Sequence, residues 1–350
     1  MTKLPEPDLG QALISKDRYL STEFQAWERD RLWPAVWNLV GPTSDVAEPG
    51  DYLVFNLGVE SVLVVHGDDG RLRAFHNVCQ HRGRALCDPG LGRGASLVCP
   101  YHRWQYGLDG RLLGVPSEDR FTGCLDRERA TLAEIAVETF AGFFWVCLAE
   151  SPEPLEQYLG PLAERLAGHA LEQFALVEDL TAEVACNWKV GVDAFNEAYH
   201  LSSVHPELCR ELDPTRVSRE ALGRHNLIRV PSRTTPGLSS DQYFIFPNTT
   251  LSVFGTRLML MRHRPHADSP ERMLLDQQQF ERAAPGAPRP PRPAWRLSPS
   301  LGHVTDQDLA QLPQVQRGMR SPRFDGPILG RDEELVAHMH RTLDAYLDGV

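Results

Sequence analysis

The sequence reads CQHRG at residues 79–83 and CPYH at residues 99–102. Each segment supplies one cysteine thiolate and one histidine imidazole, and both groups are common metal ligands. The four candidate ligands are Cys79, His81, Cys99 and His102. Because each segment holds two ligands, the pattern predicts a metal site built from a pair of loops.

Two kinds of metal site use two cysteines and two histidines. A structural zinc ion is usually held by two closely spaced cysteines followed by two closely spaced histidines. A Rieske [2Fe–2S] centre instead has two cysteines on one iron and two histidines on the other. The alternating order in this chain favours the [2Fe–2S] centre and departs from the usual zinc order. The glycines of residues 90–94 are expected to let backbone amides approach the bridging sulfides.

The residues around these loops predict a small all-β domain. Apolar stretches and turn signals predict short strands between residues 35 and 148. Residues 140–148 are aromatic and β-branched enough to form a single buried strand, with Gly142 as a bulge. The proline-containing segment 151–154 marks the end of this domain.

The rest of the chain predicts a mixture of helices and strands. Residues 21–33 are expected to form a helix that is capped by Ser21 or Thr22 and ended by Pro34. Helices are also expected at 155–168, from Asn187 onward, at 306–318 and at 331–347, and strands at 174–186, 243–246, 250–254 and 257–264. The segment 285–293 holds many prolines and is expected to be an exposed loop. The predicted fold class is therefore α+β.

The composition limits the classes of function. The chain has 350 residues and a net charge of −11, whereas nucleic-acid-binding domains usually carry a basic surplus. Its longest strongly apolar run, residues 140–149, is much shorter than the ~20 residues that span a bilayer, and residues 1–8 lack the pattern of a secretory signal. Seven cysteines, an odd number, favour a reducing compartment over a disulfide framework. We expect a cytoplasmic protein that binds neither nucleic acid nor membranes.

A second pair of candidate metal ligands lies after the predicted domain boundary, where His200 is followed by His205 and Pro206. On an ideal helix, residues five apart differ in direction by roughly 140°. Both histidines can therefore bind one ion only if the helix ends or bulges between them, and Pro206 favours an end because it disfavours helical backbone at the preceding residue. Two histidines and one carboxylate leave open positions on an iron ion. Many acidic residues could supply that carboxylate, and spacing does not choose among them.

Trp104 and Tyr106 extend the second segment to CPYHxWxY, and with them the two loops closely resemble the Rieske domain of Rieske non-haem iron oxygenases. The resemblance spans the chain from its N-terminal helix to its C-terminus and is to the catalytic alpha subunit of the aromatic ring-hydroxylating dioxygenase family. Members often have glycine where this chain has Arg103, a difference expected to alter only the local surface. The resemblance implies one [2Fe–2S] cluster and one Fe(II) per chain.

The resemblance also implies the remaining site residues. Aligning residues 315–318 with the family places the carboxylate ligand of the iron at Asp308, with Asp306 as the alternative. Glu197 lies three residues before His200, on the same face of the expected helix. In the family, an acidic residue at this position links the iron-ligand histidine to a Rieske histidine of a neighbouring subunit and so forms an electron-transfer bridge. The alternative for Glu197 is a solvated helix acid.

The implied architecture has three parts. Residues 1–36 form an N-terminal helical segment that packs with the catalytic domain, and residues 37–150 form the Rieske domain. Residues 151–350 form the catalytic domain with the mononuclear iron. This domain is expected to have the helix-grip fold, in which an antiparallel sheet curves around a long helix.

The implied function is that of a terminal oxygenase, a mono- or dioxygenase that hydroxylates a small aromatic or apolar substrate with O2. Electrons are expected from a separate NAD(P)H-dependent reductase, directly or through a ferredoxin, and the subunits are expected to form a homotrimer. One alternative is an oxidative N- or O-demethylase with the same metals. Another is a non-catalytic Rieske electron carrier, which needs no open iron site. Phe244, Phe246, Phe254 and Met259 are expected to line the substrate pocket, the alternative being ordinary sheet core.

Overall fold

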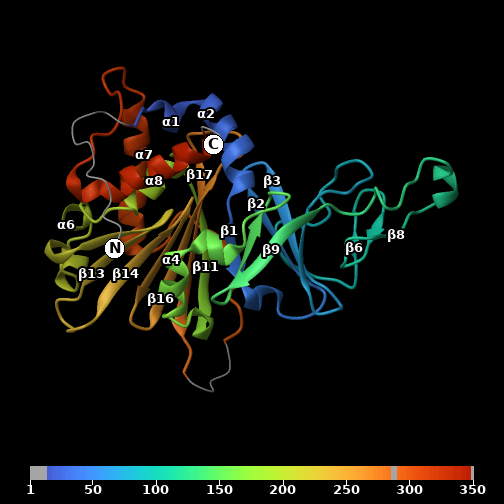
Figure 1. The fold of residues 1–350 in the computed structure, drawn as a ribbon, viewed down its shortest axis with the longest axis horizontal. Coiled ribbons are helices and arrows are strands. Elements are labelled where there is room, and N and C mark those ends of the chain that lie inside the picture. The colour runs from blue at the N-terminus through green and yellow to red at the C-terminus, as the bar shows by residue number, and fades with distance from the viewer. Residues whose placement is uncertain (1–13, 285–289, 348–350) are drawn as a thin grey trace. The chain divides into compact units, whose positions relative to one another are not determined.

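The computed structural model describes residues 14–284 and 290–347 and divides the chain into two compact units (Figure 1). The small unit is Pro34–Tyr158. The large unit combines the described residues up to Trp33 with those from Leu159 onward. Residues 285–289 of the expected proline-rich loop lie outside the described residues.

The small unit is built mainly from strands. Their bounds are β1 (Asn38–Pro42), β2 (Asp51–Leu57), β3 (Glu60–His66), β4 (Leu72–His76), β5 (Gly90–Arg93), β6 (Leu97–Val98), β7 (Gln105–Tyr106), β8 (Leu112–Gly114), β9 (Glu134–Phe140) and β10 (Phe143–Cys147). Seven of them form a sheet in the order β1-β10-β9-β4-β3-β2-β5, and the other three form a sheet in the order β6-β7-β8. All the pairs are antiparallel, and the prediction of an all-β domain is confirmed.

Two details of this unit differ from the expectations. Residues 140–148 form two strands instead of one, because Ala141 and Gly142 make a two-residue turn with φ of 51° and 82° between β9 and β10. Positive φ at both positions is typical of the tight turns that join adjacent antiparallel strands. The glycine-rich run at 90–94 is mostly the edge strand β5, which pairs with β2, and is not a loop around a cluster.

The hydrophobic core of the small unit reaches the two predicted metal-binding loops. Phe75, Trp104 and Tyr106 are at most 5% exposed and belong to one cluster of buried side chains. The same cluster contains Cys79 and Cys99. Burying a large side chain contributes roughly 1.5–3 kcal/mol, so packing against this core holds both cysteines in place.

The large unit contains an eight-stranded sheet. Its strands are β11 (Phe174–Val184), β12 (Ser218–Leu222), β13 (His225–Pro231), β14 (Ser239–Ile245), β15 (Thr249–Phe254), β16 (Arg257–Pro265), β17 (Met273–Arg282) and β18 (Arg296–Leu297). Their order is β12-β13-β14-β15-β16-β17-β11-β18, and only the short edge strand β18 is parallel to its neighbour. Of these, β12, β13, β17 and β18 were not expected from the sequence.

Eight α-helices are described. They are α1 (Asp17–Leu20), α2 (Thr22–Trp27), α3 (Leu155–Leu159), α4 (Pro161–Ala167), α5 (Trp188–Ala194), α6 (Leu201–Val204), α7 (His303–Met319) and α8 (Glu334–Leu347). The helix expected at 155–168 is interrupted at Gly160, whose φ of 51° and ψ of −129° lie outside the helical region. The helix expected at 21–33 is regular only to Trp27 and continues as a π-helical turn to Leu32.

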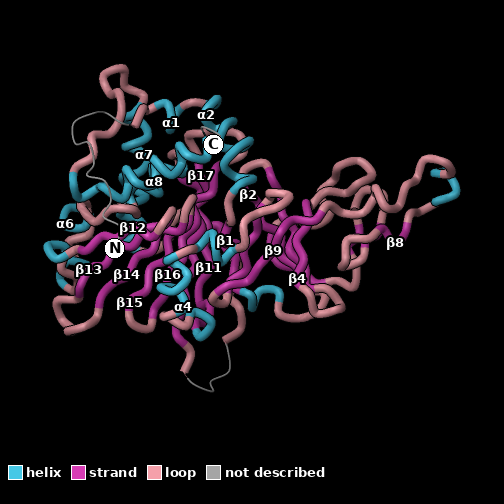
Figure 2. The backbone as a smooth tube through the Cα atoms, viewed as in Figure 1, coloured by secondary structure: helices cyan, strands magenta, loops and turns pink. Residues whose placement is uncertain are grey.

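Helices α7 and α8 run along one face of the large sheet (Figure 2). Thr305 of α7 donates a hydrogen bond to Gln277 of β17, with 2.6 Å between their oxygens. Asn226 of β13 donates through Nδ2 to the carbonyl of Leu335 in α8 at 3.2 Å. Direct cross-strand pairing through β14, β15 and β16 places Asn226 and Gln277 in one row on the same face. The prediction of an antiparallel sheet with packed helices is confirmed.

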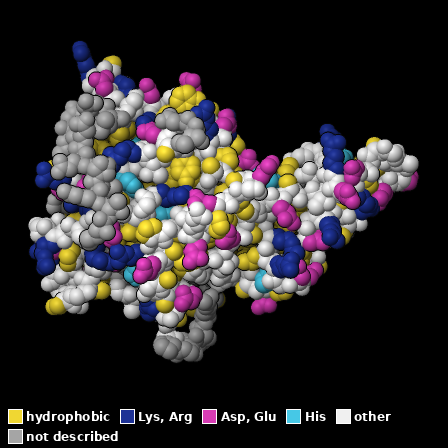
Figure 3. Space-filling view, viewed as in Figure 1, with side chains coloured by type: hydrophobic (Ala, Val, Ile, Leu, Met, Phe, Trp, Pro, Cys, Tyr) yellow, Lys and Arg dark blue, Asp and Glu magenta, His cyan; other side chains and the backbone are white. Residues whose placement is uncertain are grey.

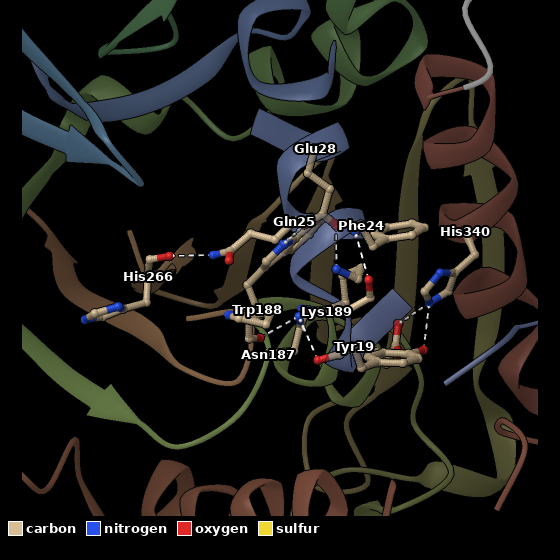
Figure 4. Close-up of polar contacts among 12 residues, drawn as sticks. Tyr19, Phe24, Gln25, Glu28, Asn187, Trp188, Lys189, His266 and His340 are labelled. Atoms are coloured by element: carbon tan, nitrogen blue, oxygen red, sulfur yellow. Dashed lines mark hydrogen bonds and ion pairs between the residues drawn. The ribbon is translucent and has the colours of Figure 1, made fainter. Parts of the chain in front are cut away.

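The N-terminal segment is bound to α5 by a buried polar network (Figure 4). Lys189 and Glu28 are at most 1% exposed and form an ion pair with Nζ and Oε1 2.5 Å apart. The Tyr19 hydroxyl donates to Asp193 at 2.6 Å, and His340 of α8 contacts the same carboxylate at 3.0 Å. These contacts connect α5 with two segments that are distant in the sequence, so α5 has a defined position in the large unit.

The visible surface carries both signs of charge. On the face drawn in Figure 3, acidic and basic side chains of the described residues are interspersed and do not form one continuous basic surface. This distribution accords with the net charge of −11. Among the described residues, none of the helices combines the length and the apolar composition needed to cross a membrane.

Candidate metal centres

The two Cys–His loops have the same backbone hydrogen bonds. In the first loop, the carbonyl of Cys79 accepts from the amide of Gly83 at 2.9 Å, and in the second that of Cys99 accepts from Arg103 at 3.0 Å. The amide of each cysteine also donates to the carbonyl five residues later, at 2.8 and 2.9 Å. The loops are therefore two copies of one turn, although one has a single residue between its ligands and the other has two.

Arg103 has a backbone conformation that usually favours glycine. Its φ is 63°, close to the 73° of Gly83 at the equivalent position of the first loop. A side chain in the left-handed region costs roughly 1–2 kcal/mol. The sequence suggested that the difference from the family at Arg103 alters only the local surface. The positive φ shows that it also affects the backbone of the second Cys–His loop.

The four side chains lie close together but do not converge on one ion. Cys79 and Cys99 are each 2% exposed, and the rings of His81 and His102 have centroids 4.7 Å apart. Four ligands of one zinc ion each lie about 2.0–2.3 Å from it, so their ligand atoms are close to one another. Among the described residues, the ligand atoms of these four side chains do not all lie within 4.8 Å of one another. His102 Nδ1 is buried without a hydrogen-bond partner. The donor set and this unpaired nitrogen fit a two-iron cluster.

Tyr106 is a polar neighbour of the first cysteine that the sequence did not assign a role. Its hydroxyl lies 3.3 Å from Cys79 Sγ and accepts a hydrogen bond from the amide of Gln80 at 3.1 Å. Burial raises the pKa of the Cys79 thiol, and the hydrogen bond from Tyr106 acts in the opposite direction. The hydroxyl therefore favours the thiolate, which is the form that binds iron.

Replacing Tyr106 with phenylalanine is expected to lower the reduction potential of the cluster by roughly 40 mV, because a hydrogen bond of about 1 kcal/mol to the thiolate stabilises the added electron. A redox titration followed by EPR measures the shift. Tyr101→Phe is the matched control, since Tyr101 is 57% exposed in the other loop. Equal potentials in both variants and the wild type would contradict this role for the hydroxyl.

The segment with the second pair of histidines is not one continuous helix. The sequence predicted that Glu197 and His200 lie on one helix. Helix α5 ends at Ala194, however, and Glu197 lies in the link that follows it. His200 and His205 are the residues on either side of α6, a single turn. His205 has φ of −122° and ψ of 59°, as expected for a residue forced out of the helix by Pro206. Because the helical turn ends at His205, the two rings are able to face one point.

The structure brings His200, His205 and Asp308 together. Their ligand atoms all lie within 4.8 Å of one another, and theirs is the one such group found among residues 14–284 and 290–347. Oδ1 of Asp308 lies 3.0 Å from Nε2 of His205 and 3.8 Å from Nε2 of His200. Oδ2 of Asp308 is buried and has no hydrogen-bond partner. Two imidazole nitrogens and an unpaired carboxylate oxygen facing one point fit a bound metal ion.

The other nitrogen of each imidazole is held by a neighbour. His205 Nδ1 lies 2.6 Å from Oε1 of Gln307, and His200 Nδ1 contacts the carboxylate of Glu197. An acceptor at Nδ1 places the ring proton there and leaves Nε2 free to bind a metal. Gln307 was not expected to act at this site, and only its position beside Asp308 could have suggested it. Burial lowers the pKa of His205, but hydrogen bonds to Asp308 and Gln307 outweigh burial and raise it.

Asp306 lies outside this group. Its two oxygens accept hydrogen bonds from the amide of Leu301 at 2.8 Å and from the hydroxyl of Ser300 at 2.6 Å. The Asp306 carboxylate therefore accepts hydrogen bonds from residues just before α7, and an acidic side chain is favourable near the N-terminus of a helix. The geometry favours Asp308 over Asp306 as the carboxylate ligand.

The expected pocket residues are mostly core. Phe244 and Phe246 are at most 2% exposed and have almost no accessible surface to offer a substrate. Phe254 and Met259 are partly exposed. The apolar pocket predicted from these four residues is therefore not supported at Phe244 and Phe246, where the ordinary-core alternative applies.

Models of two protein families match the chain. Residues 36–140 match the family described as "Rieske [2Fe-2S] domain". Residues 171–240 and 229–349 match the family described as "Ring hydroxylating alpha subunit (catalytic domain)".

Three known proteins are similar to this chain. The glycine betaine monooxygenase oxygenase subunit of Pseudomonas aeruginosa (strain UCBPP-PA14) is 37% identical over 176 residues, which are 50% of this chain but only 41% of that protein. The chloroplastic choline monooxygenase of Beta vulgaris is 28% identical over 338 residues, 92% of this chain and 74% of that protein. The crystal structure of the quaternary ammonium Rieske monooxygenase CntA with L-carnitine has a TM-score of 0.82, 24% identity and full coverage of both chains, which confirms the fold.

Proposed function

The chain belongs to the ring-hydroxylating alpha-subunit family, and from that premise we propose that it oxidises a small quaternary ammonium compound with O2. The proposed reaction is hydroxylation of a carbon bonded to the nitrogen. For an N-methyl group, O2, two electrons and two protons give a hydroxymethyl group and water. The hydroxymethyl group then leaves as formaldehyde with loss of a proton, and a tertiary amine remains.

The observation that carries this proposal is the convergence of His200, His205 and Asp308, whose ligand atoms all lie within 4.8 Å of one another, while Oδ2 of the buried Asp308 carboxylate has no hydrogen-bond partner. Two histidines and one carboxylate leave open positions on an iron ion, which O2 chemistry requires. A Rieske electron carrier needs no such group. This favours an oxygenase over the electron-carrier alternative.

We assign the [2Fe–2S] cluster to Cys79, His81, Cys99 and His102, in a Rieske domain of residues 37–150, and the iron ion to the catalytic domain of residues 151–350 together with residues 1–36. When bound, the two metal centres deliver electrons and activate O2. Glu197 and Gln307 hold the Nδ1 protons of the iron-binding histidines. The buried carboxylate of Asp308 supplies the negative charge of the site.

The substrate assignment replaces the expected aromatic compound. Glycine betaine, choline and L-carnitine, named for the similar proteins, all contain a trimethylammonium group. The burial of Phe244 and Phe246 also removes two of the aromatic residues on which an apolar pocket depended. Both observations favour the N-dealkylation alternative over ring hydroxylation.

The proposed partners are a separate NAD(P)H-dependent reductase and further copies of the chain. We propose a homotrimer in which Glu197 connects the iron site of one subunit to the Rieske cluster of the next. Glu197 already contacts His200 within the chain, and the neighbouring Tyr199 is 69% exposed. The bridge therefore lies beside an accessible surface that a second subunit can cover.

Single turnover of the chemically reduced protein tests the function. We expect glycine betaine, choline or carnitine to give a tertiary amine and an equal amount of an aldehyde, both detected by mass spectrometry, with the oxygen atom inserted from O2 leaving in the aldehyde. Naphthalene and indole are the comparison substrates and are expected to remain at least tenfold less oxidised. Diols from the aromatic compounds alone would instead favour ring hydroxylation. A protein that contains both metal centres but oxidises none of these compounds would contradict the proposed function.

A further inference from the structure

Helix α7 presents one buried face along its length. Its buried residues recur at intervals of three or four and are each at most 5% exposed; they are Thr305, Asp308, Leu312, Gln316 and Met319. Thr305 attaches this face to the sheet through its hydrogen bond to Gln277, three residues before Asp308. Gln316 lies eight residues after Asp308 and is 2% exposed. Asp308 thus lies between two buried polar side chains of the same helix face.

The side chain of Gln316 attaches α7 to the beginning of α5. Its Oε1 accepts a hydrogen bond from the backbone amide of Asn187 at 2.8 Å. Its Nε2 donates to the carbonyl of Tyr19 at 3.3 Å and to Oε2 of Glu271 at 3.2 Å. A glutamine amide offers an acceptor oxygen and two N–H donors, so one side chain serves all three partners.

Asn187 joins the same junction through its own side chain. It is the N-cap of α5, and its Oδ1 accepts from the amide of Lys189 at 2.9 Å. Its Nδ2 donates to the carbonyl of Tyr19 at 3.2 Å (Figure 4). The Tyr19 carbonyl therefore accepts from both Asn187 and Gln316, and this one oxygen joins the N-terminal segment, α5 and α7.

The same tyrosine also contacts the other end of α5. Its hydroxyl donates to Asp193, the residue before the last of the helix. Tyr19 is 0% exposed, and Asn187 and Gln316 are each 2% exposed. A shift of α5 along its axis would leave buried donors and acceptors unpaired, which is unfavourable. Helix α5 is thus a fixed reference against which Gln316 holds α7.

The histidine-bearing segment is held independently of α7. Asn196 lies four residues before His200 and is 0% exposed, and its Nδ2 donates to the carbonyl of Leu335 in α8 at 3.0 Å. Asp308 belongs to α7 instead, so the 3.8 Å between its Oδ1 and Nε2 of His200 depends on where α7 lies. Gln316 fixes that helix on the C-terminal side of Asp308.

We propose that Gln316 is a positioning residue of the mononuclear iron site, which holds α7 against the beginning of α5 and so sets the place of Asp308 relative to His200 and His205. The proposal rests on the metal site of the proposed function. Gln316 does not belong to the group of metal-binding side chains and acts through the helix. Metal ligands must be held within about 0.5 Å of their productive geometry, and a buried amide with three partners restricts α7 in this way.

Binding of Co(II) tests this role, in protein that keeps its [2Fe–2S] cluster but has been freed of mononuclear iron. Co(II) accepts the same imidazole and carboxylate ligands. Gln316→Met keeps the size of the side chain but removes its strong donors and acceptor. We expect this variant to bind Co(II) about tenfold more weakly than the wild type in equilibrium dialysis. The reduction potential of the cluster is expected to stay unchanged. Gln316→Asn, a milder change, is expected to weaken Co(II) binding by a smaller factor.

Gln278→Met is the matched control. Gln278 is also a buried glutamine of the large unit, 3% exposed, and it donates to Asp179 at 3.2 Å. As the neighbour of Gln277 in β17, it points to the opposite face of the sheet from α7. We expect Gln278→Met to bind Co(II) as the wild type does, and denaturant unfolding of each variant measures its loss of stability.

Two results would overturn the role of Gln316. If Gln316→Met and Gln316→Asn bind Co(II) as tightly as Gln278→Met, Gln316 only packs, although the metal site stands. If Gln316→Met does not fold, unchanged Co(II) binding by Gln316→Asn leads to the same conclusion. Asp308→Ala gives the level of Co(II) binding without the site. A wild type that binds Co(II) no more tightly than Asp308→Ala would contradict the metal site of the proposed function, and this inference would fail with it.

Discussion

Asp308→Ala is expected to abolish oxygenation and to remove the mononuclear iron while the [2Fe–2S] cluster remains. Asp308 is 4% exposed and is the anionic member of the group with His200 and His205. Without it, two neutral imidazoles remain, and these hold Fe(II) poorly. Iron analysis is expected to fall from about three atoms per chain to about two, with an unchanged Rieske EPR signal.

Asp306→Ala is the matched control, two residues away on the same helix. Asp306 bonds to the amide of Leu301 and the hydroxyl of Ser300, so its loss removes contacts at the start of α7. We expect all three irons to remain, activity to persist, and the free energy of unfolding to fall by about 1 kcal/mol. Loss of iron from Asp306→Ala with retention in Asp308→Ala would move the ligand assignment by two residues.

The two Cys–His loops could be predicted because the residues that identify each loop are close together in the sequence. Cys79 and His81 are almost adjacent, as are Cys99 and His102, and the order of residue types alone distinguishes the two kinds of metal site. The left-handed conformation at Arg103 could not be predicted in the same way. An arginine carries no signal for positive φ, which appears only when the second loop is seen to repeat the hydrogen bonds of the first.

The mononuclear site could be predicted only in part. Pro206 marks the end of the turn at His205, which is a local effect. Asp308 lies more than a hundred residues away in the sequence, and many acidic residues share its chemistry. Its choice as the candidate ligand needed a resemblance. The structure shows how it comes to lie beside His205: α7 packs on the sheet through Thr305, three residues before Asp308.

The accessible part of the large sheet could not be predicted from the sequence. Alternation shows which residues of β14 and β15 share a face, but not which row of that face remains accessible. Phe244 and Gln242 point to the same side, yet Phe244 is buried and Gln242 is partly exposed. The difference depends on which part of the sheet the helices cover, and this is a property of the tertiary packing.

Glu197→Gln is expected to keep both metals but to slow electron transfer from the cluster to the mononuclear iron by at least tenfold. The Glu197 carboxylate accepts from the amides of Tyr199 and His200 and contacts Nδ1 of His200, and its side chain is 11% exposed. Glutamine keeps the length but removes the charge, and hydrogen bonds with an ionised partner are roughly twice as strong as neutral ones. Stopped-flow oxidation of the reduced Rieske absorbance, with substrate and O2 present, measures this step.

Glu333→Gln is the matched control for the loss of a carboxylate close to Glu197. Burial raises the pKa of Glu333, with a further contribution from the charge of Glu197, and its carboxylate accepts a hydrogen bond from the amide of Gly330. We expect this variant to reoxidise its cluster at the wild-type rate. Light scattering distinguishes loss of the trimer from loss of the bridge within an intact trimer. A Glu197→Gln protein that stays trimeric but reoxidises slowly has lost the bridge. Wild-type reoxidation in that variant, or a fully active monomer, would make Glu197 a carboxylate that only holds the backbone and the Nδ1 proton of its own His200.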